Sequence, residues 1–272
     1  MTINCLGKLI DLSTPKVMGI LNLTPNSFYD GGKYSDEKNI LSKVAQMISD
    51  GATFIDIGAY SSKPNAEFVS EAEEINRLKP VFPLLKKHFP EVLLSVDTFR
   101  ANVAKFAVNE GVALVNDISA GSLDAEMMKT VAKLRVPYIM MHMKGTPQTM
   151  QSFATYENMV KEMLFYFSEK IGQAKSFGIN DVIIDPGFGF AKTISQNFEL
   201  MNNLELFKML ELPVLVGVSR KSMIYKTLDT TPEFALNGTT VLNTIALQKG
   251  ANILRVHDVK EAVECVKILN NL

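Results

Sequence analysis

Eight short apolar runs in this chain each end on or beside a polar or charged residue, and the segments between them are long enough for at least one helix. The residues in question are Asn22, Asp56, Asp97, Asn116, His142, Asp185, Ser219 and His257. The runs are apolar throughout rather than alternating, which is typical of parallel strands covered on both faces. This repeat predicts a parallel α/β barrel, whose functional groups gather at the carboxyl ends of its strands.

The apolar runs and the turn formers between them define the expected elements. Strands are expected at 17–21, 54–57, 93–96, 113–115, 138–141, 182–184, 214–218 and 253–256. Helices are expected at about 37–49, 70–88, 100–110, 124–134, 156–177, 195–210, 233–249 and 258–270. Residues 3–6 and 9–12 flank Gly7-Lys8 and predict a hairpin that plugs the base of the barrel. Pro80 and Pro83 are expected to bend or divide the helix that opens with Ser70 and Glu73 at capping-box spacing.

The expected fold is therefore an α/β (β/α)8 TIM barrel with an N-terminal β-hairpin. A chain of 272 residues suits one such barrel, and the absence of a linker or low-complexity stretch indicates a single domain over 1–272. An open, doubly wound sheet of eight strands is the alternative, because the sequence does not show that the sheet closes.

Composition limits the classes of partner and compartment. A net charge of −1 gives no electrostatic case for nucleic acid or an anionic membrane. No apolar stretch reaches the ~18 residues of a membrane span, and the amino terminus lacks a secretory pattern. Cys5 and Cys265 have neither metal spacing nor a disulfide framework, so a reducing, cytoplasmic compartment is expected.

Three acidic or amide side chains close predicted strands, namely Asp97, Asn116 and Asp185. Any one of them could simply cap the following helix. Together on one rim they suit a flat heterocycle with several N–H donors along an edge, because a carboxylate accepts two parallel hydrogen bonds. A pterin or guanine-like ring has such an edge, and Met140 and Phe190 could supply its apolar walls.

A basic group is predicted on the same rim. Strand geometry puts Arg255 and His257 on one face, and Lys221 and Ser222 follow the seventh predicted strand. Because the loops after strands seven and eight of such barrels frequently hold phosphate, these residues predict an anion site. Arg220 is as easily a solvated surface residue as a functional one.

Two further features concern cations and phosphates. Asn22 ends the first predicted strand, and its carbonyl is a modest ligand for Mg²⁺ held mainly by water and substrate phosphates; a turn-capping role is the default. The glycine-rich segment 185–190 (DPGFGF) lacks the spacing of a P-loop or a dinucleotide fingerprint. Its glycines are expected to let the backbone pass close to a flat ligand.

Several long motifs resemble those of the dihydropteroate synthase family, in the family's order. They are 19–28 (GILNLTPNSF), 95–98 (SVDT), 115–119 (VNDIS), 141–147 (MHMKGTP), 185–190 (DPGFGF), 219–222 (SRKS) and 255–259 (RVHDV). The resemblance implies a (β/α)8 barrel, usually a homodimer, that joins 4-aminobenzoate to 6-hydroxymethyl-7,8-dihydropterin diphosphate in folate biosynthesis. Diphosphate leaves with Mg²⁺ present, and sulfonamides compete with the aminobenzoate.

The resemblance also implies roles for individual residues. Asp97, Asp185 and Lys221 would be catalytic, Asn22 would meet Mg²⁺, and Arg255 with His257 would hold the diphosphate. The full predicted substrate-binding set, from the residues and the resemblance together, is Ser62, Lys63, Asp97, Asn116, Met140, Asp185, Phe190, Gly217, Lys221, Ser222, Arg255 and His257.

One segment departs from the family pattern. The family commonly has Glu-Ser-Thr-Arg-Pro-Gly after the second strand, whereas residues 60–65 here read YSSKPN. Ser62 keeps a hydroxyl for the diphosphate, but Lys63 replaces a planar guanidinium with a point charge. Two rival functions stay open at this stage: a pterin-dependent methyltransferase on a related barrel, and an inactive pterin-binding paralogue.

Overall fold

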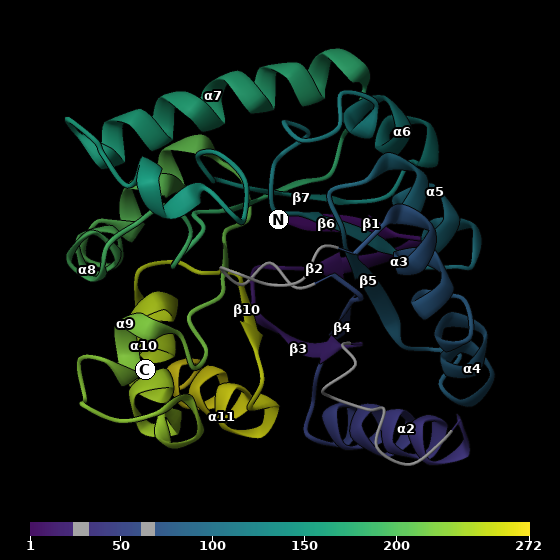
Figure 1. The fold of residues 1–272 in the computed structure, drawn as a ribbon. Coiled ribbons are helices and arrows are strands. Elements are labelled where there is room, and N and C mark those ends of the chain that lie inside the picture. The colour runs from purple at the N-terminus through teal and green to yellow at the C-terminus, as the bar shows by residue number, and fades with distance from the viewer. Residues whose placement is uncertain (24–32, 61–68) are drawn as a thin grey trace.

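The chain forms a closed barrel of parallel strands surrounded by helices, seen nearly end-on in Figure 1. The computed structural model describes residues 1–23, 33–60 and 69–272. The barrel strands are β3 (Lys16–Asn22), β4 (Phe54–Gly58), β5 (Leu93–Asp97), β6 (Leu114–Asp117), β7 (Tyr138–Met141), β8 (Val182–Asp185), β9 (Leu215–Val216) and β10 (Ile253–Val256). Their order in the sheet is β8-β7-β6-β5-β4-β3-β10-β9, so the predicted barrel strands pair in chain order.

The sheet closes between its first and last members. Ile184 of β8 forms a parallel bridge with Val214, just ahead of β9, and the Ile184 N–H donates to the Pro213 carbonyl at 2.9 Å. The predicted TIM barrel is confirmed, and the open-sheet alternative is wrong.

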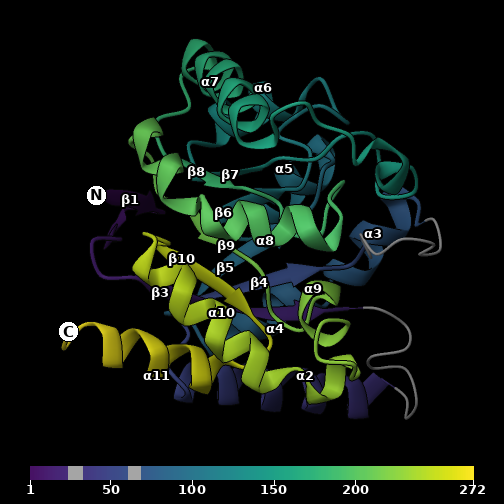
Figure 2. The ribbon, with the colours of Figure 1, turned by 90° about the vertical axis from the view of Figure 1, so that its left-hand side faces the viewer.

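Helices cover the outside of the barrel, with α7 on one side and α2 on the opposite side in both views (Figures 1 and 2). They are α2 (Lys33–Ser49), α3 (Glu71–Leu78), α4 (Val81–His88), α5 (Ala101–Asn109), α6 (Met127–Leu134), α7 (Met159–Phe177), α8 (Ile194–Asn202), α9 (Ser222–Tyr225), α10 (Leu236–Gln248) and α11 (Val259–Leu269). Short 3-10 helices are η1 (Met150–Phe153), η2 (Leu204–Leu210) and η3 (Pro232–Phe234). Among the helices of the described residues, none combines the length and apolar character that crossing a bilayer needs.

Prolines and polar residues explain where the observed helices differ from the expected ones. The segment 70–88 divides into α3 and α4 because Pro80, at the start of α4, has no N–H to continue the first helix. Ser70 caps α3 by accepting a hydrogen bond from the Glu73 N–H. The segment 195–210 ends as an α-helix at Asn202 and continues as η2, and 233–249 begins as η3.

The seventh strand is shorter than predicted, because β9 covers only Leu215–Val216. Beyond it the Ser219 hydroxyl, rather than a backbone carbonyl, accepts the His257 N–H at 3.1 Å. Arg220 then adopts a left-handed conformation, with φ of 55°, that turns the chain away from the sheet. Side-chain bonding thus replaces the ladder at the end of this strand.

The N-terminal hairpin, β1 (Thr2–Cys5) and β2 (Lys8–Asp11), seals the amino end of the barrel as predicted. It lies to one side of the barrel in Figure 2. Its inward side chains Ile3, Cys5 and Ile10, with Leu12, pack in one buried cluster with inward residues of the barrel strands, among them Phe54 and Ile253. The base of the barrel is therefore apolar and filled.

Successive side chains of each strand point alternately out of the barrel and into it. Outward residues such as Leu94 and Val96 of β5 join the large cluster beneath the helices. Beyond the apolar base most inward residues are polar, among them Asp56, Asn116 and Arg255. The barrel therefore has an apolar base that stabilises it and a largely polar mouth at the carboxyl ends of its strands.

This division predicts separable mutational effects at the base. Leu12 is fully buried there, so Leu12→Ala should lower the free energy of unfolding by about 2–5 kcal/mol, measured by urea denaturation. Leu9, 70% exposed on the same hairpin, is the matched control, and Leu9→Ala should change stability by no more than about 0.5 kcal/mol. A loss of specific activity in the folded Leu12→Ala protein would contradict the division.

Candidate active site

Strand register brings three of the predicted rim positions into one row, with Gly58 between two of them. Asn22 pairs with Gly58, Gly58 with Asp97, and Asp97 with Asn116 across four neighbouring strands. A Cβ placed on Gly58 would lie 3.7 Å from both the Asn22 Oδ1 and the Asp97 Oδ2, so a glycine leaves room for both side chains. The carboxyl edge of the sheet therefore carries an amide, a carboxylate and a second amide side by side.

Arg255 ties this row to the inside of the barrel. Its Nε donates to Asp56 Oδ2 at 2.6 Å and its Nη2 donates to Asp97 Oδ2 at 2.6 Å. Asn116 joins the same network by donating from Nδ2 to Asp56 Oδ2 at 2.9 Å. Gly217 lies against Arg255, since a Cβ on that glycine would be 3.8 Å from the arginine Cβ. Residues from distant parts of the sequence thus form one polar layer.

Asp56, one of the eight strand-end residues of the sequence, belongs to this layer although no role was predicted for it. Asp56 is fully buried, and its Oδ1 has no hydrogen-bond partner among the described residues. The signal was present, because a carboxylate inside an apolar strand needs a buried partner. Asp56 therefore holds Arg255 and Asn116 in place.

The protonation equilibria of the acidic groups are shifted by their surroundings. Burial raises the pKa of Asp97 to about 7; Arg255 lowers it, whereas Asp56, Glu74 and Asp117 raise it further. Burial also raises the pKa of Asp185, against the opposing effect of Lys221. For Arg255, burial lowers the pKa, but Asp56 and Asp97 more than offset this, so the guanidinium stays charged. Perturbed carboxylates at one mouth are typical of a functional site.

Lys221 and the glycine-rich segment form a second side of the mouth. The Lys221 Nζ donates to the Phe188 carbonyl and lies 4.9 Å from the centre of the Phe190 ring. Gly189 makes room for the lysine stem, because a Cβ there would come within 3.2 Å of Lys221 Cδ. Burial lowers the pKa of Lys221 to about 8, while Asp185 raises it.

Asp185 ends β8 beside the same segment. Its Oδ1 accepts the Gly187 N–H at 2.7 Å, and Met141 of β7 is its register partner. Gly187 has a φ of 71°, and a Cβ on it would lie 2.2 Å from the His142 carbonyl. Gly187 is thus required because its segment packs closely on the backbone of His142. The sequence analysis had explained this glycine by the close approach of a ligand.

The prediction of Met140 as an apolar wall needs correction by one residue. Met140 is fully buried in the cluster beneath the helices, together with Tyr138. Met141 instead packs with Ile118 in the cluster at the mouth, against which Phe190 is partly buried. Successive side chains of a strand point to opposite faces, so only one of the two adjacent methionines can face the mouth.

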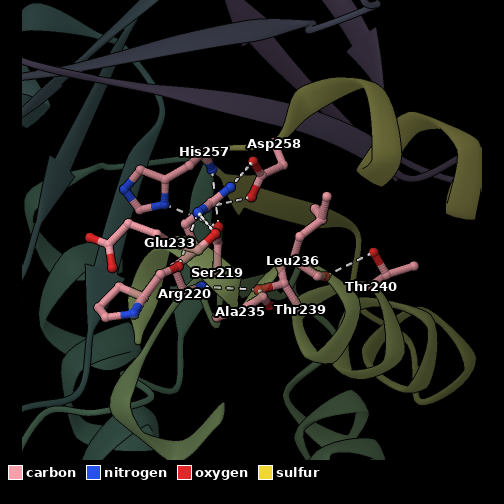
Figure 3. A network of polar contacts seen from close by, with 10 residues as sticks. Ser219, Arg220, Glu233, Ala235, Leu236, Thr239, Thr240, His257 and Asp258 are labelled. Carbon is pink, nitrogen blue, oxygen red and sulfur yellow. Dashed lines mark hydrogen bonds and ion pairs between the residues drawn. The ribbon is translucent and has the colours of Figure 1, made fainter. Parts of the chain in front are cut away.

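The loops after β9 and β10 are held together by the network in Figure 3. Arg220 donates to both carboxylate oxygens of Asp258, at 2.9 and 2.7 Å, and to the carbonyls of Pro232 and Glu233. The Ser219 hydroxyl lies 3.0 Å from His257 Nδ1. Arg220 is therefore neither free in solvent nor at the mouth: it fixes the two loops that carry the predicted anion site.

Three predicted anion-site positions lie on or beside those loops. His257 is exposed, Arg255 is 19% exposed, and Ser222 begins α9. Backbone N–H groups in the first turn of a helix have no partner within the helix. The remaining predicted contacts, Ser62 and Lys63, and the long loop that follows Asn22 lie outside the described residues.

Asn22, the predicted Mg²⁺ ligand, ends β3 in the same row as Gly58 and Asp97. No group of three or more His, Cys, Asp or Glu side chains within the described ranges could hold a metal ion. An amide oxygen near one carboxylate matches Mg²⁺, which usually keeps several waters and takes its other ligands from substrate phosphates.

Comparison with known proteins agrees with this geometry. Residues 18–257 match the family described as pterin binding enzymes. Dihydropteroate synthase of Haemophilus influenzae is 42% identical over 264 residues, covering 96% of this chain and 95% of the relative. The Escherichia coli K12 enzyme of the same name is 41% identical over 265 residues, covering 97% and 93%.

Solved structures of similar proteins share the whole fold. Yersinia pestis dihydropteroate synthase, in a sulfonamide drug complex, has a TM-score of 0.93 with 40% identity, covering 100% of this chain and 98% of that one. Xanthomonas albilineans dihydropteroate synthase with 4-aminobenzoic acid has a TM-score of 0.92 with 35% identity, covering 99% and 97%. The chain therefore belongs to the pterin-binding enzyme family, among its dihydropteroate synthases.

Proposed function

We propose that this chain condenses 6-hydroxymethyl-7,8-dihydropterin diphosphate with 4-aminobenzoate, giving 7,8-dihydropteroate and diphosphate. The observation that carries the proposal is the convergence of Asp97, Asn116 and Asp185 on one mouth with Lys221 and Arg255. The acidic and amide groups suit the N–H edge of a pterin ring, because a carboxylate accepts two parallel hydrogen bonds. A ligand complex of one relative includes 4-aminobenzoic acid, which supports the second substrate.

The proposed chemistry is dissociative. The bond between the pterinylmethyl carbon and the diphosphate oxygen breaks first, and its electron pair leaves with the diphosphate. The dihydropterin ring delocalises the resulting cation, which Asp97 and Asp185 stabilise as fixed negative groups in a site shielded from water. The aminobenzoate nitrogen then attacks the same carbon and loses its proton. Lys221, which interacts electrostatically with Asp185 and lies 4.9 Å from the centre of the Phe190 ring, contributes to pterin binding.

Diphosphate binding is assigned to the basic side of the mouth. His257 is an exposed residue, and the Arg220–Asp258 pair fixes the loop that carries it. Arg255 is already paired with two carboxylates, so its contact with diphosphate would be shared with Asp56 and Asp97. Ser62 and Lys63 are proposed to add contacts from the loop after β4.

Mg²⁺ is the proposed cofactor, with Asn22 as its protein ligand. When bound it would neutralise charge on the leaving diphosphate. The Asn22 Oδ1 and the Asp97 Oδ2 approach the same point above Gly58, which supports an oxygen-lined position for a hard cation.

A homodimer and a cytoplasmic location complete the proposal. Large apolar side chains are exposed on several covering helices, including Phe165 of α7 and Met209 of η2, at 66% and 73%. Such groups are compatible with an interface between copies of the chain. Cys5 and Cys265 are both buried and free, as expected in a reducing compartment.

A diphosphate-release assay tests the reaction itself. Release should require the dihydropterin diphosphate, 4-aminobenzoate and Mg²⁺ together, and EDTA should abolish it. Pterin binding in titration calorimetry without any condensation product would instead support an inactive paralogue. Methyl transfer without diphosphate release would support a pterin-dependent methyltransferase.

Replacing Asp185 by asparagine tests the electrostatic role. The new amide oxygen can still accept the Gly187 N–H, so the segment keeps its shape while the negative charge is lost. Turnover should fall at least about 10²-fold in steady-state assays. Asp181→Asn is the matched control, because Asp181 accepts the Asn4 N–H at the base of the barrel. Normal turnover in Asp185→Asn would refute this role.

The raised pKa of Asp97 predicts a pH dependence of pterin binding. Above about pH 7 the side chain is ionised and accepts two hydrogen bonds, whereas below it the protonated form loses that capacity. The Kd for 6-hydroxymethylpterin, measured by calorimetry, should rise as the pH falls below about 7, approaching about tenfold per unit. In Asp97→Asn the affinity should be low and lack this acid-side dependence, while Asp181→Asn should behave as wild type. An unchanged slope in Asp97→Asn would exclude Asp97 as the titrating group.

A further inference from the structure

Lys192 is a buried lysine that the proposed mechanism does not use. It follows the glycine-rich segment and is only 3% exposed. Its Nζ lies 3.0 Å from the Gly187 carbonyl, 3.1 Å from the Phe190 carbonyl and 3.1 Å from His142 Nδ1. An ammonium group has three donors, so these acceptors match its full hydrogen-bonding capacity.

Two of the three acceptors belong to the segment that forms one side of the mouth. Lys192 holds the carbonyl of Gly187, and the N–H of the same glycine donates to Asp185 Oδ1 at 2.7 Å. The lysine is thus linked through one residue to the carboxylate that faces the ligand. Its second carbonyl partner belongs to Phe190, whose ring lies 4.9 Å from Lys221 Nζ.

His142 provides the fixed point for this arrangement. It is 2% exposed, and its ring meets the Tyr166 ring edge-on with centroids 4.9 Å apart. For Nδ1 to accept from an ammonium, the imidazole must be neutral with its proton on Nε2. Burial, with Lys192 and Lys144 nearby, lowers the pKa of His142 to about 2, which supports the neutral form.

Burying the Lys192 ammonium costs desolvation free energy, and filling the space would not require a charged group. Burial lowers the pKa of Lys192 to about 7, although Asp185 raises it. A methionine of similar length could fill the same space without desolvating a charge. Asn197 also holds the glycine-rich segment, because its Oδ1 accepts the Gly189 N–H at 2.6 Å. The additional effect of Lys192 is on Gly187 and Phe190, the residues beside the ligand groups.

We propose that Lys192 is a positioning residue: its ammonium, anchored on His142, fixes the Gly187 and Phe190 carbonyls and thereby orients the Asp185 carboxylate and the Phe190 ring for the pterin. This inference rests on the proposed function for the identity of the ligand. It assigns Lys192 no contact with substrate, because its donors are all directed at the chain.

The test compares Lys192→Met with wild type, using the Kd of 6-hydroxymethylpterin from calorimetry together with kcat and both KM values. The Met variant should bind the pterin at least about tenfold more weakly and show a lower kcat. Lys249→Met is the matched control: Lys249 also donates to a backbone carbonyl, that of Asn202, but precedes β10 at the base. It should bind and turn over as wild type.

Thermal denaturation separates positioning from a purely structural role. A lysine that only stabilises the fold would lower the Tm of the Met variant while leaving the pterin Kd of the folded protein unchanged, and that result overturns the inference. If the Met variant does not fold, Lys192→Gln, which keeps a smaller neutral donor, takes its place with the same criterion. Absence of condensation by the wild type would refute the proposed function, whereas the Kd comparison judges Lys192 independently of turnover.

Discussion

The ion pairs of Arg255 with Asp56 and Asp97 are the interactions on which the polar layer of the barrel depends. One guanidinium joins a carboxylate from the interior of β4 to another at the end of β5, and Asn116 is drawn in through Asp56. Removing either partner of such a pair leaves an uncompensated buried charge, which is far more costly than exchanging the pair for apolar groups. The site and the upper interior of the barrel are therefore one electrostatic unit, and a substitution in it acts on both.

Much of the fold could be predicted from the sequence, because strands covered on both faces are apolar without interruption and these runs are easily recognised. β7 and β10 have the predicted bounds, whereas the hairpin forms one residue earlier than predicted, because Leu6-Gly7 is the turn and Lys8 pairs with Cys5. β9 could not be predicted in its true length, since the loss of its ladder depends on the Ser219 side chain meeting the backbone N–H of His257, just after β10. Such a replacement is a tertiary contact that a local apolar pattern does not contain.

The candidate site was predicted less evenly, for reasons of geometry. Asp97, Asn116 and Asp185 could be predicted because they lie at the ends of strands on one rim. Asp56 is recognisable in the same way, but its role as the partner of Arg255 depends on a contact between distant strands. Met140 was predicted as an apolar wall, but it and Met141 are equivalent in composition, and only the alternation of the strand shows which of them faces the mouth. Lys192 offered no signal at all, because its role depends on three acceptors that the fold brings around its amine.

The bridge between Ile184 and Val214 closes the barrel with less strand pairing than most of its other junctions have. Most neighbouring strands share several register pairs, but β8 is joined to the β9 segment by this one bridge. Strand pairing is therefore least extensive at this junction. Asp185 stands at the end of the strand on one side of that junction, and Lys221 follows the strand on the other. A ligand that contacts both residues would bridge this junction, and its binding would stabilise the closed form of the barrel.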